Sequence, residues 1–237
     1  MSDGIIHSML SGLSSTRVQH EGEIMVIGLG RFGSALANTL VGMGYEVLGV
    51  DFEEDIVQEH AGTLTHVVQA DTTSERVLRQ IGAADVVTAV VCIGTDVESS
   101  VLTTSALVDL GVANVWAKAI TTAHGRILQR VGAHHVVFPE AEMGSRVAHL
   151  VTGQALEYLP LDENFVIAEM TAPKELVGVA LGSSNLRANY KVTVVCVKPQ
   201  GEQFTYADRE TVLSPSDLIV IAGHRADVDR FTDHQRH

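Results

Sequence analysis

Apolar residues in this chain fall into short runs that recur at a regular spacing from residue 23 onward. Between these runs, residues such as Leu36, Leu40 and Met43 have the spacing of an amphipathic helix. Strands and helices that alternate about every 20 residues form compact domains through right-handed crossovers. The pattern therefore predicts a doubly wound parallel β-sheet with helices on both faces. Its six strands are expected at Ile24–Gly28, Tyr45–Val50, Thr65–Gln69, Asp85–Ile93, Asn114–Ala119 and His135–Phe138.

Helix boundaries are marked by residues suited to helix ends. Glycine favours the left-handed conformation that closes a helix, and four glycines fall where a helix should end. These are Gly44, Gly82, Gly111 and Gly132. The segment from Thr95 to Glu98 has the T-x-x-E form of a capping box, which predicts Thr95 as the N-cap of the following helix.

The pattern changes near residue 153, where Gly153, Pro160 and Asp162 interrupt a helix-like stretch over residues 141–152. Beyond this point the apolar runs are shorter, with helices expected near residues 181–189 and 226–231. We expect an N-terminal extension (1–22), a doubly wound domain (23–153) and a small α+β domain (154–237). Strands in the last domain are expected at Phe165–Met170, Val192–Val197, Gln203–Tyr206 and Leu218–Ala222.

Composition narrows the class of protein. The 237 residues are 46% apolar and carry a net charge of −13, which excludes a disordered chain and disfavours nucleic acid as a partner. No apolar run approaches the ~20 residues of a membrane span, and residues 1–22 lack the pattern of a signal peptide. Cys92 and Cys196 lie in apolar runs, as buried free thiols do. We therefore expect a soluble cytosolic protein.

The first strand leads into Gly28-Leu29-Gly30-Arg31-Phe32-Gly33 and then a helix. This is the G-x-G-x-x-G motif in its strand–turn–helix context. The glycines permit a tight turn, close approach to a pyrophosphate and close helix packing, while the helix N-terminus offers N–H donors to the anion. The motif predicts a Rossmann-like nucleotide-binding domain.

An acidic residue ends the second strand, 23 residues after Gly28. Asp51 is placed to accept the hydroxyls of an adenosine ribose, with Phe52 and Glu53 next to it. A carboxylate here disfavours a 2′-phosphate, so NAD or an adenosine di- or triphosphate is preferred over NADP. The alternative is that Asp51 only begins the next turn.

Ligands of such sheets lie at the carboxyl ends of the strands, so other contacts are expected just after each strand. Asp71 and Thr72 are placed to contact the adenine edge, or instead to cap a helix through Arg79. Lys118 and Glu140 are placed either to pair with each other or to contact phosphate and a divalent cation. The remaining candidates are Ile93, Gly94, Thr95 and His124, the last a lone histidine for which a surface or capping role is the alternative.

Arg31 places a fixed cation inside the phosphate loop, which favours a ligand with additional terminal phosphate. A solvated arginine beside the loop is the alternative. Metal-protease, deaminase, hydrolase and P-loop motifs are not found in the sequence, and the second domain offers only scattered polar residues. A regulator fits this sequence better than an enzyme does, with an NAD(H)-dependent oxidoreductase and a redox-sensing repressor as the rival hypotheses.

These residues together resemble the RCK (KTN) domain family. The resemblance rests on GLGRFG, Asp51, the segments at 70–73 and 115–119, and residues 130–148; residues 181–195 and 213–224 are similar to the companion RCK-C (TrkA-C) module. One RCK-N followed by one RCK-C domain resembles the cytosolic Ktr-type regulatory subunits of bacterial potassium uptake systems.

This resemblance implies a homodimer-based octameric ring that docks on an integral-membrane Ktr/Trk-type channel subunit at the inner face of the cell membrane. It implies that ATP and ADP compete for the cleft, with NAD(H) bound by some relatives. The matching positions give Gly28, Gly30 and Gly33 to the phosphates and Arg31 to the terminal phosphate of ATP. Asp51 corresponds to the ribose ligand, and Glu140 corresponds to a Mg²⁺ or Ca²⁺ site.

The resemblance also implies a site for cyclic di-AMP in the C-terminal module, with Arg187 as the phosphate partner. Val179 and Ala180 stand where bulkier aliphatic residues are common, so packing against a base would be poorer. The alternative is that Leu181 and Leu186 simply form the core side of a helix. The corresponding residues are Val179, Ala180, Leu181, Asn185, Leu186, Arg187, Asn189 and Tyr190.

Overall fold

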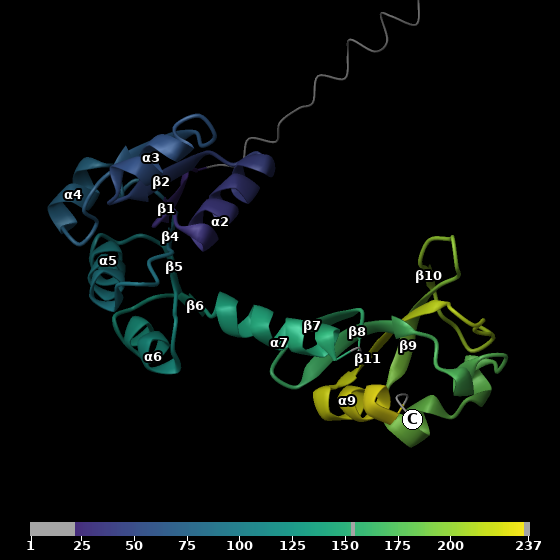
Figure 1. Cartoon of the computed structure of the whole chain (residues 1–237). Coiled ribbons are helices and arrows are strands. Elements are labelled where there is room, and N and C mark those ends of the chain that lie inside the picture. Colours follow the sequence, from purple (N-terminus) through teal and green to yellow (C-terminus); the bar gives the residue numbers. More distant parts are fainter. Residues whose placement is uncertain (1–21, 153–154, 235–237) are drawn as a thin grey trace, which may run out of the picture. The chain divides into compact units, whose positions relative to one another are not determined.

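The computed structural model describes residues 22–152 and 155–234 (Figure 1). The chain divides into two compact units, Met1–Pro139 and Glu140–His237. The helix after the sixth strand is thus grouped largely with the C-terminal unit, whereas the sequence places the domain boundary at residue 153; that boundary stays a prediction. Nearly all of the expected extension at 1–22 lies outside the described residues. No helix in the described ranges is long and apolar enough to cross a membrane.

The N-terminal unit contains, within residues 22–139, a six-stranded parallel sheet in the order β3-β2-β1-β4-β5-β6. This confirms the expected Rossmann-like doubly wound sheet. The fourth strand is shorter than expected, because it begins at Thr88 and the preceding residues Asp85, Val86 and Val87 are not part of the sheet. The strands are β1 (Ile24–Ile27), β2 (Val47–Asp51), β3 (His66–Gln69), β4 (Thr88–Val91), β5 (Asn114–Lys118) and β6 (His135–Val137).

Alternating side chains of the strands enter two separate cores, because successive residues of a strand point to opposite faces. Met25 and Ile27 belong to one buried cluster, with residues from α4, α5 and α6. Val26 belongs to the other, with residues from α2 and α3. The helices are α2 (Arg31–Gly42), α3 (Glu54–His60), α4 (Glu75–Gln80), α5 (Val97–Asp109) and α6 (Thr122–Arg130).

The helix ends follow the sequence signals, with one exception. All four glycines expected at helix ends have positive φ angles. The capping box at Thr95 is wrong, because the N-cap of α5 is Asp96, whose Oδ1 accepts a hydrogen bond from the Ser99 backbone N–H at 3.1 Å. Asp96 is as good a cap as threonine, and the helix begins one residue later than expected.

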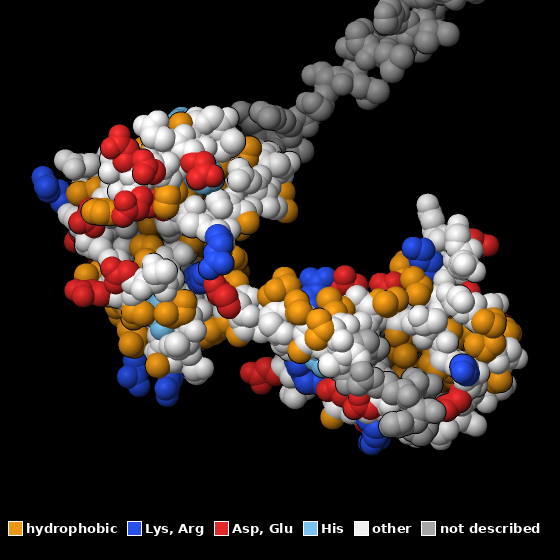
Figure 2. All heavy atoms as spheres, in the orientation of Figure 1, with side chains coloured by type: hydrophobic (Ala, Val, Ile, Leu, Met, Phe, Trp, Pro, Cys, Tyr) orange, Lys and Arg blue, Asp and Glu red, His pale blue; other side chains and the backbone are white. Residues whose placement is uncertain are grey.

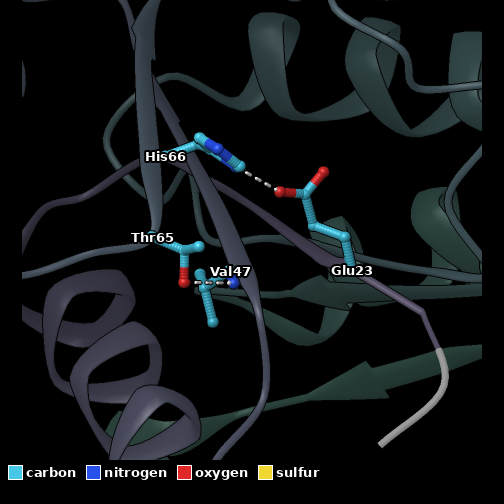
Figure 3. Close-up of polar contacts among 4 residues, drawn as sticks. All are labelled: Glu23, Val47, Thr65 and His66. Carbon is cyan, nitrogen blue, oxygen red and sulfur yellow. Dashed lines mark hydrogen bonds and ion pairs between the residues drawn. The ribbon is translucent and has the colours of Figure 1, made fainter. Parts of the chain in front are cut away.

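Side chains close the amino edge of the sheet (Figure 3). Glu23, just before β1, lies 2.8 Å through Oε1 from Nδ1 of His66 at the start of β3. Thr65 Oγ1 accepts a hydrogen bond from the Val47 N–H of β2 at 3.1 Å. These contacts join three neighbouring strands at the edge opposite the loops that carry the predicted site.

The C-terminal unit is built on an antiparallel sheet, in the order β10-β9-β11-β8-β7. This confirms the expected α+β architecture. The helix-like stretch ends at Val151, close to where the sequence predicts an interruption, and residues around Pro160 form the edge strand β7. One local expectation is wrong: the helix expected at 181–189 is split in two at Asn185, whose φ of 53° breaks it.

The core of this unit lies between one sheet face and α9, with Val166, Ile219, Ile221 and Phe231 at most 1% exposed. The strands are β7 (Glu157–Pro160), β8 (Phe165–Thr171), β9 (Thr193–Lys198), β10 (Thr205–Tyr206) and β11 (Leu218–His224). The helices are α7 (Pro139–Val151), η1 (Lys174–Leu176), η2 (Leu181–Ser183), α8 (Leu186–Tyr190) and α9 (Arg225–His234).

Candidate functional site

The turn between β1 and α2 is held in a tight backbone conformation. Gly28 has a φ of 88°, and its N–H donates to the carbonyl oxygen of Val50 at 2.8 Å. A Cβ on Gly33 would lie 1.9 Å from the Gly28 carbonyl oxygen, so only glycine permits this closeness of helix and turn. A Cβ on Gly30 would meet no atom within 4 Å. The space above Gly30 is therefore open to a ligand.

The N-terminus of α2 is suited to an anion. The helix begins at Arg31 after Gly30 as N-cap, and among the described residues no side chain caps it and no acidic residue lies in its first turn. Its first N–H groups therefore point into the turn without a side-chain acceptor, and the helix dipole favours negative charge there. Arg31 is exposed and adds a full positive charge.

Asp51, at the end of β2, is fixed by two backbone N–H groups. Its Oδ2 accepts a hydrogen bond from Leu29 N–H at 2.6 Å, and its Oδ1 accepts one from Glu53 N–H at 3.0 Å. The carboxylate is thus tied to the glycine loop, and each oxygen keeps a second lone pair for a ribose hydroxyl. Phe52 is 65% exposed next to it. The structure therefore brings Asp51 and the glycine loop together, as the sequence predicts.

The residues after β3 take different roles from one another. Asp71 is exposed, and its Oδ1 accepts hydrogen bonds from the backbone N–H and the hydroxyl of Thr73 at 3.0 and 2.6 Å. Thr72 is buried, with its hydroxyl 3.0 Å from that of Thr103 on α5. Arg79 pairs with Glu75 at 2.7 Å. The alternative in which Asp71 or Thr72 caps a helix through Arg79 is therefore wrong.

The residues after β4 lie against the glycine loop. A Cβ on Gly28 would be 3.2 Å from the Ile93 nitrogen, so the two turns touch. Thr95 is exposed, and Asp96 behind it caps α5. Hydrogen bonds from the Ser99 hydroxyl and backbone N–H lower the pKa of the Asp96 carboxyl below its usual value.

Lys118, at the end of β5, is only 8% exposed. Its Nζ lies 5.5 Å from the centroid of the Phe32 ring. Burial raises the pKa of the nearby Cys92 thiol to about 12, although the Lys118 charge acts in the opposite direction. Cys92 is thus a protonated, unreactive core residue, as expected, whereas Cys196 is partly exposed. Both cysteines are free.

His124 lies inside α6 rather than at an exposed edge. It is 2% exposed, and within the described part of the chain its Nε2 has no hydrogen-bond partner. Its backbone N–H is capped by the Thr121 hydroxyl at 3.1 Å. Desolvation by burial lowers the pKa of the imidazole. The surface role expected as an alternative for His124 is wrong, because the side chain is buried. Its Nδ1 accepts a hydrogen bond from the Ile120 backbone N–H at 3.5 Å, as a capping residue does. Its role as a ligand contact stays a prediction.

Glu140 is exposed at the start of α7 and belongs to the C-terminal unit. Among the described residues, no group of three His, Cys, Asp or Glu side chains is arranged to hold a metal ion. The cation role of Glu140 therefore stays a prediction.

The C-terminal unit contains a cavity of about 600 Å³. Four of the residues expected to bind a second messenger line it, namely Leu181, Asn185, Leu186 and Arg187. Val179, Ala180, Asn189 and Tyr190 are not among its lining residues. The remaining lining residues are Gly182, Ala188, Val192, Thr193, Val194, Ala207, Asp208, Arg209 and Glu210.

Charged side chains of both signs line this cavity. Arg187 donates from Nε to the Thr193 hydroxyl at 2.9 Å, which fixes its guanidinium. Arg209 lies in the loop after β10 and was not predicted as a cavity residue. The sequence feature that marks it is the charged run Asp208-Arg209-Glu210, which follows a predicted strand. Leu186 is also part of the buried core, so its core role and its place in the cavity wall are compatible.

Comparison with known proteins identifies the two domains. Residues 24–139 match the TrkA-N domain family, and residues 165–235 match the TrkA-C domain family. The GsuK channel bound to NAD has a similar fold, with a TM-score of 0.61 and 20% sequence identity. That match covers 88% of this chain and 38% of the GsuK chain, so this chain spans well under half of that channel's length.

Two curated proteins of Bacillus subtilis (strain 168) are similar over nearly their full length. Ktr system potassium uptake protein C is 36% identical and Ktr system potassium uptake protein A is 34% identical, each over 88% of this chain and 95% of the relative. With both domains matched in the expected order, this chain belongs to the TrkA-N/TrkA-C (RCK) family of Ktr-type potassium uptake proteins.

Proposed function

We propose that this chain is the nucleotide-dependent regulatory subunit of a potassium uptake system and that it acts, without being an enzyme, at the cytoplasmic face of the membrane. Its partner would be an integral-membrane Ktr/Trk-type channel subunit. The observation that carries the proposal is the Asp51 carboxylate bonded to the glycine loop beside an uncapped helix N-terminus, in a chain whose curated relatives are Ktr potassium uptake proteins.

The ligand of the N-terminal unit is ADP or ATP, with NAD(H) as the other candidate. Figure 2 shows Asp and Glu side chains over the surface around α3, where Glu53, Glu54 and Asp55 are exposed. This acidic surface lies beside Asp51, whereas the cation Arg31 lies at the start of α2. The charges therefore favour a ligand with its ribose at Asp51 and its phosphates at α2. The NAD-bound GsuK channel, similar in fold, supports NAD(H) as a candidate.

Gating follows from differential binding. ATP carries one more phosphate than ADP. Arg31 is exposed at the phosphate loop, where its positive charge can interact with that additional phosphate. A ligand shifts a conformational equilibrium only by its difference in affinity for the two states. The chain would assemble as homodimers into an octameric ring whose shape differs between the two nucleotides, with a divalent cation held near Glu140.

The cavity of the C-terminal unit is the proposed site for cyclic di-AMP. Arg187, held by Thr193, is placed to contact a phosphate, and Leu181 and Leu186 supply apolar wall for a base. Its volume of about 600 Å³ is in the range of small-molecule sites.

Calorimetric titration tests the proposal directly. Purified protein is titrated with ATP, ADP, NADH and cyclic di-AMP, each with and without Mg²⁺, while light scattering gives the mass of the assembly. Tight ATP and ADP binding to a large ring supports the gating role. Binding of NADH alone to a dimer, with hydride transfer in a substrate screen, would favour the oxidoreductase instead.

Arg31→Ala tests the gating mechanism. We expect the variant to lose the preference for ATP over ADP and, when reconstituted with the channel subunit, to lose the nucleotide dependence of potassium flux. An unchanged preference together with an unchanged flux would refute the role of Arg31.

A further inference from the structure

The Lys118 side chain crosses the end of a neighbouring strand. It leaves the end of β5, and β4 lies between β5 and β1 in the sheet. A Cβ on Gly94, just past β4, would lie 3.2 Å from Lys118 Nζ and 3.4 Å from Cε. The lysine stem therefore passes directly over the Gly94 backbone. The ammonium reaches within 5.5 Å of the centre of the Phe32 ring, in the first turn of α2.

This position coincides with the place where such sheets bind ligands. The strand order reverses between β1 and β4, and ligands of open α/β sheets bind at that switch point. Lys118 as a whole residue is only 8% exposed, and a buried charge is costly in free energy unless nearby groups stabilise it. The face of the Phe32 ring does so, because an aromatic face attracts a cation within about 6 Å.

Gly94 has a steric role rather than a conformational one. Its φ is not among the positive values in the chain, so any residue can adopt its backbone conformation. The atoms nearest to an added Cβ would be the end of the Lys118 side chain and the Ile120 Cγ2 atom, at 3.2–3.4 Å. Because Gly94 has no side chain, the Lys118 side chain has room to pass over it.

We propose that Phe32 and Gly94 are positioning residues that hold the Lys118 ammonium at the phosphate loop, and that this cation makes the site prefer nucleoside diphosphates over monophosphates. The proposal rests on the nucleotide-binding function proposed above and extends it. The first phosphate occupies the N-terminus of α2, and Lys118 contacts the next one as a point charge. Phe32 acts through Lys118 and has no direct role in selecting the phosphate.

The test is calorimetric titration with ADP and AMP of the wild type, Lys118→Gln, Phe32→Leu, Gly94→Ala and the Lys118→Gln/Phe32→Leu double variant. Lys118→Gln is expected to lower ADP affinity about tenfold to a hundredfold and AMP affinity much less, as for loss of a charge-assisted bond. Phe32→Leu is expected to lower ADP affinity about threefold to tenfold, with Phe32→Tyr restoring it. Gly94→Ala should reduce the ADP preference by displacing the ammonium.

The C-terminal unit supplies matched controls. Lys198 Nζ lies 5.4 Å from the Phe204 ring centroid, a pair of the same geometry far along the chain from the nucleotide loop. Lys198→Gln and Phe204→Leu should leave both affinities unchanged. Circular dichroism establishes that each variant is folded, and Phe32→Tyr or Gly94→Ala serves if Phe32→Leu does not fold.

The double variant decides whether Phe32 acts through Lys118. We expect Phe32→Leu to have no further effect on ADP affinity once Lys118 is glutamine. Additive losses, or an equal loss of ADP and AMP affinity in Lys118→Gln, would overturn this inference while leaving the nucleotide site intact. A wild type that binds neither ADP nor AMP would instead overturn the proposed function together with it.

Discussion

The two units of this chain build their candidate sites in different ways. In the N-terminal unit, the candidate residues lie far apart in sequence, and each lies at or just past the end of a parallel strand. They are Gly28, Asp51, Asp71, Gly94 and Lys118. In the C-terminal unit, the cavity is lined by two stretches, residues 181–194 and 207–210, which flank β9 and β10. In a parallel sheet the carboxyl ends of all strands lie at the same edge, whereas in an antiparallel sheet they alternate between two opposite edges.

The two sites also differ in how charge is distributed. Around the glycine loop, the acidic residues Asp51 and Glu53 lie between the end of β2 and the start of α3. The cations lie on other elements, Arg31 at the start of α2 and Lys118 at the end of β5. In the C-terminal cavity, Arg187, Arg209, Asp208 and Glu210 all belong to the lining, so both signs of charge face the same space. Positive and negative side chains on different elements orient a ligand whose two ends differ in charge. Side chains of both signs around the same space orient such a ligand less.

The largest effect is expected from Gly33→Ala, which tests how tightly the parallel site depends on its backbone. The new Cβ would lie 1.9 Å from the Gly28 carbonyl oxygen, so helix and turn must separate. We expect a loss of about 3 kcal/mol in the free energy of unfolding, with nucleotide binding abolished. Urea denaturation and calorimetry measure the two effects.

Gly30→Ala is the matched control, because a Cβ there meets no protein atom within 4 Å. We expect less than about 1 kcal/mol of destabilisation, since only a helix cap changes, but the same loss of nucleotide affinity, because the Cβ fills ligand space. Equal stability of the two variants would contradict the tight-turn account.

Asp51→Asn tests the acidic end of the same site. The side-chain amide cannot accept from both Leu29 N–H and Glu53 N–H, so one of these two hydrogen bonds is replaced by a repulsive pair of donors. We expect a loss of about 1–2 kcal/mol in stability and a fall of about tenfold or more in nucleotide affinity. The preference for NADH over NADPH should fall too, which competition titrations measure. An unchanged preference would contradict the role of Asp51.

Arg187→Gln tests whether the two sites are separate. We expect cyclic di-AMP affinity to fall about tenfold or more, because the guanidinium held by Thr193 is lost, while ADP affinity stays unchanged. Lys174→Gln, an exposed change of the same charge outside the cavity lining, is the control and should alter neither affinity. Loss of ADP binding in Arg187→Gln would disprove the separation.

The smallest effect is expected from pH, through His124 in the N-terminal unit. Burial lowers the pKa of His124 below its unfolded value of 6.5, so the folded state favours the neutral imidazole. Its contribution to stability is complete above pH 6.5 and is lost as the pH falls through that value toward the folded pKa. The slope is at most about 1.4 kcal/mol per pH unit.

Urea denaturation at pH 7.5 and 5.5 measures this loss. His124→Gln should make the unfolding free energy less dependent on pH over that interval. A wild type that is equally stable at both values would contradict this account, because the folded and unfolded states would then take up the same number of protons.

Local rules explain most of the N-terminal unit. The hydrophobic period and the helix-ending glycines located its strands and helices, and the rule that parallel strands end at one edge located Asp51 and Gly28 together. The misplaced cap shows the limit of such rules, because the T-x-x-E pattern favours Thr95 whereas intrinsic N-cap preference favours Asp96, and the structure uses Asp96. His124 shows another limit, since its burial depends on how α6 packs.

The C-terminal unit was harder to predict. Pro160 has a strong tendency to interrupt structure, yet it ends the edge strand β7, where its missing N–H is tolerated. The break at Asn185 is a left-handed residue inside a helical pattern. Asparagine adopts this conformation more readily than most residues do, but the hydrophobic period does not show where it will be used. The Asp208–Glu210 part of the cavity wall is brought to the 181–187 segment by long-range contacts, among them the hydrogen bond from Gly182 N–H to the Arg209 carbonyl oxygen at 2.8 Å.

The sequence by itself determined the fold class of both domains, the family, the glycine loop and its acidic partner, because these depend on spacing along the chain and on rules that every parallel sheet obeys. The tertiary structure alone decided that Lys118 crosses Gly94 to the Phe32 ring, that His124 and Thr72 are buried, and which residues enclose the C-terminal cavity. These features depend on side-chain directions and on contacts between distant segments, and those are fixed only when the strands pair and the cores pack.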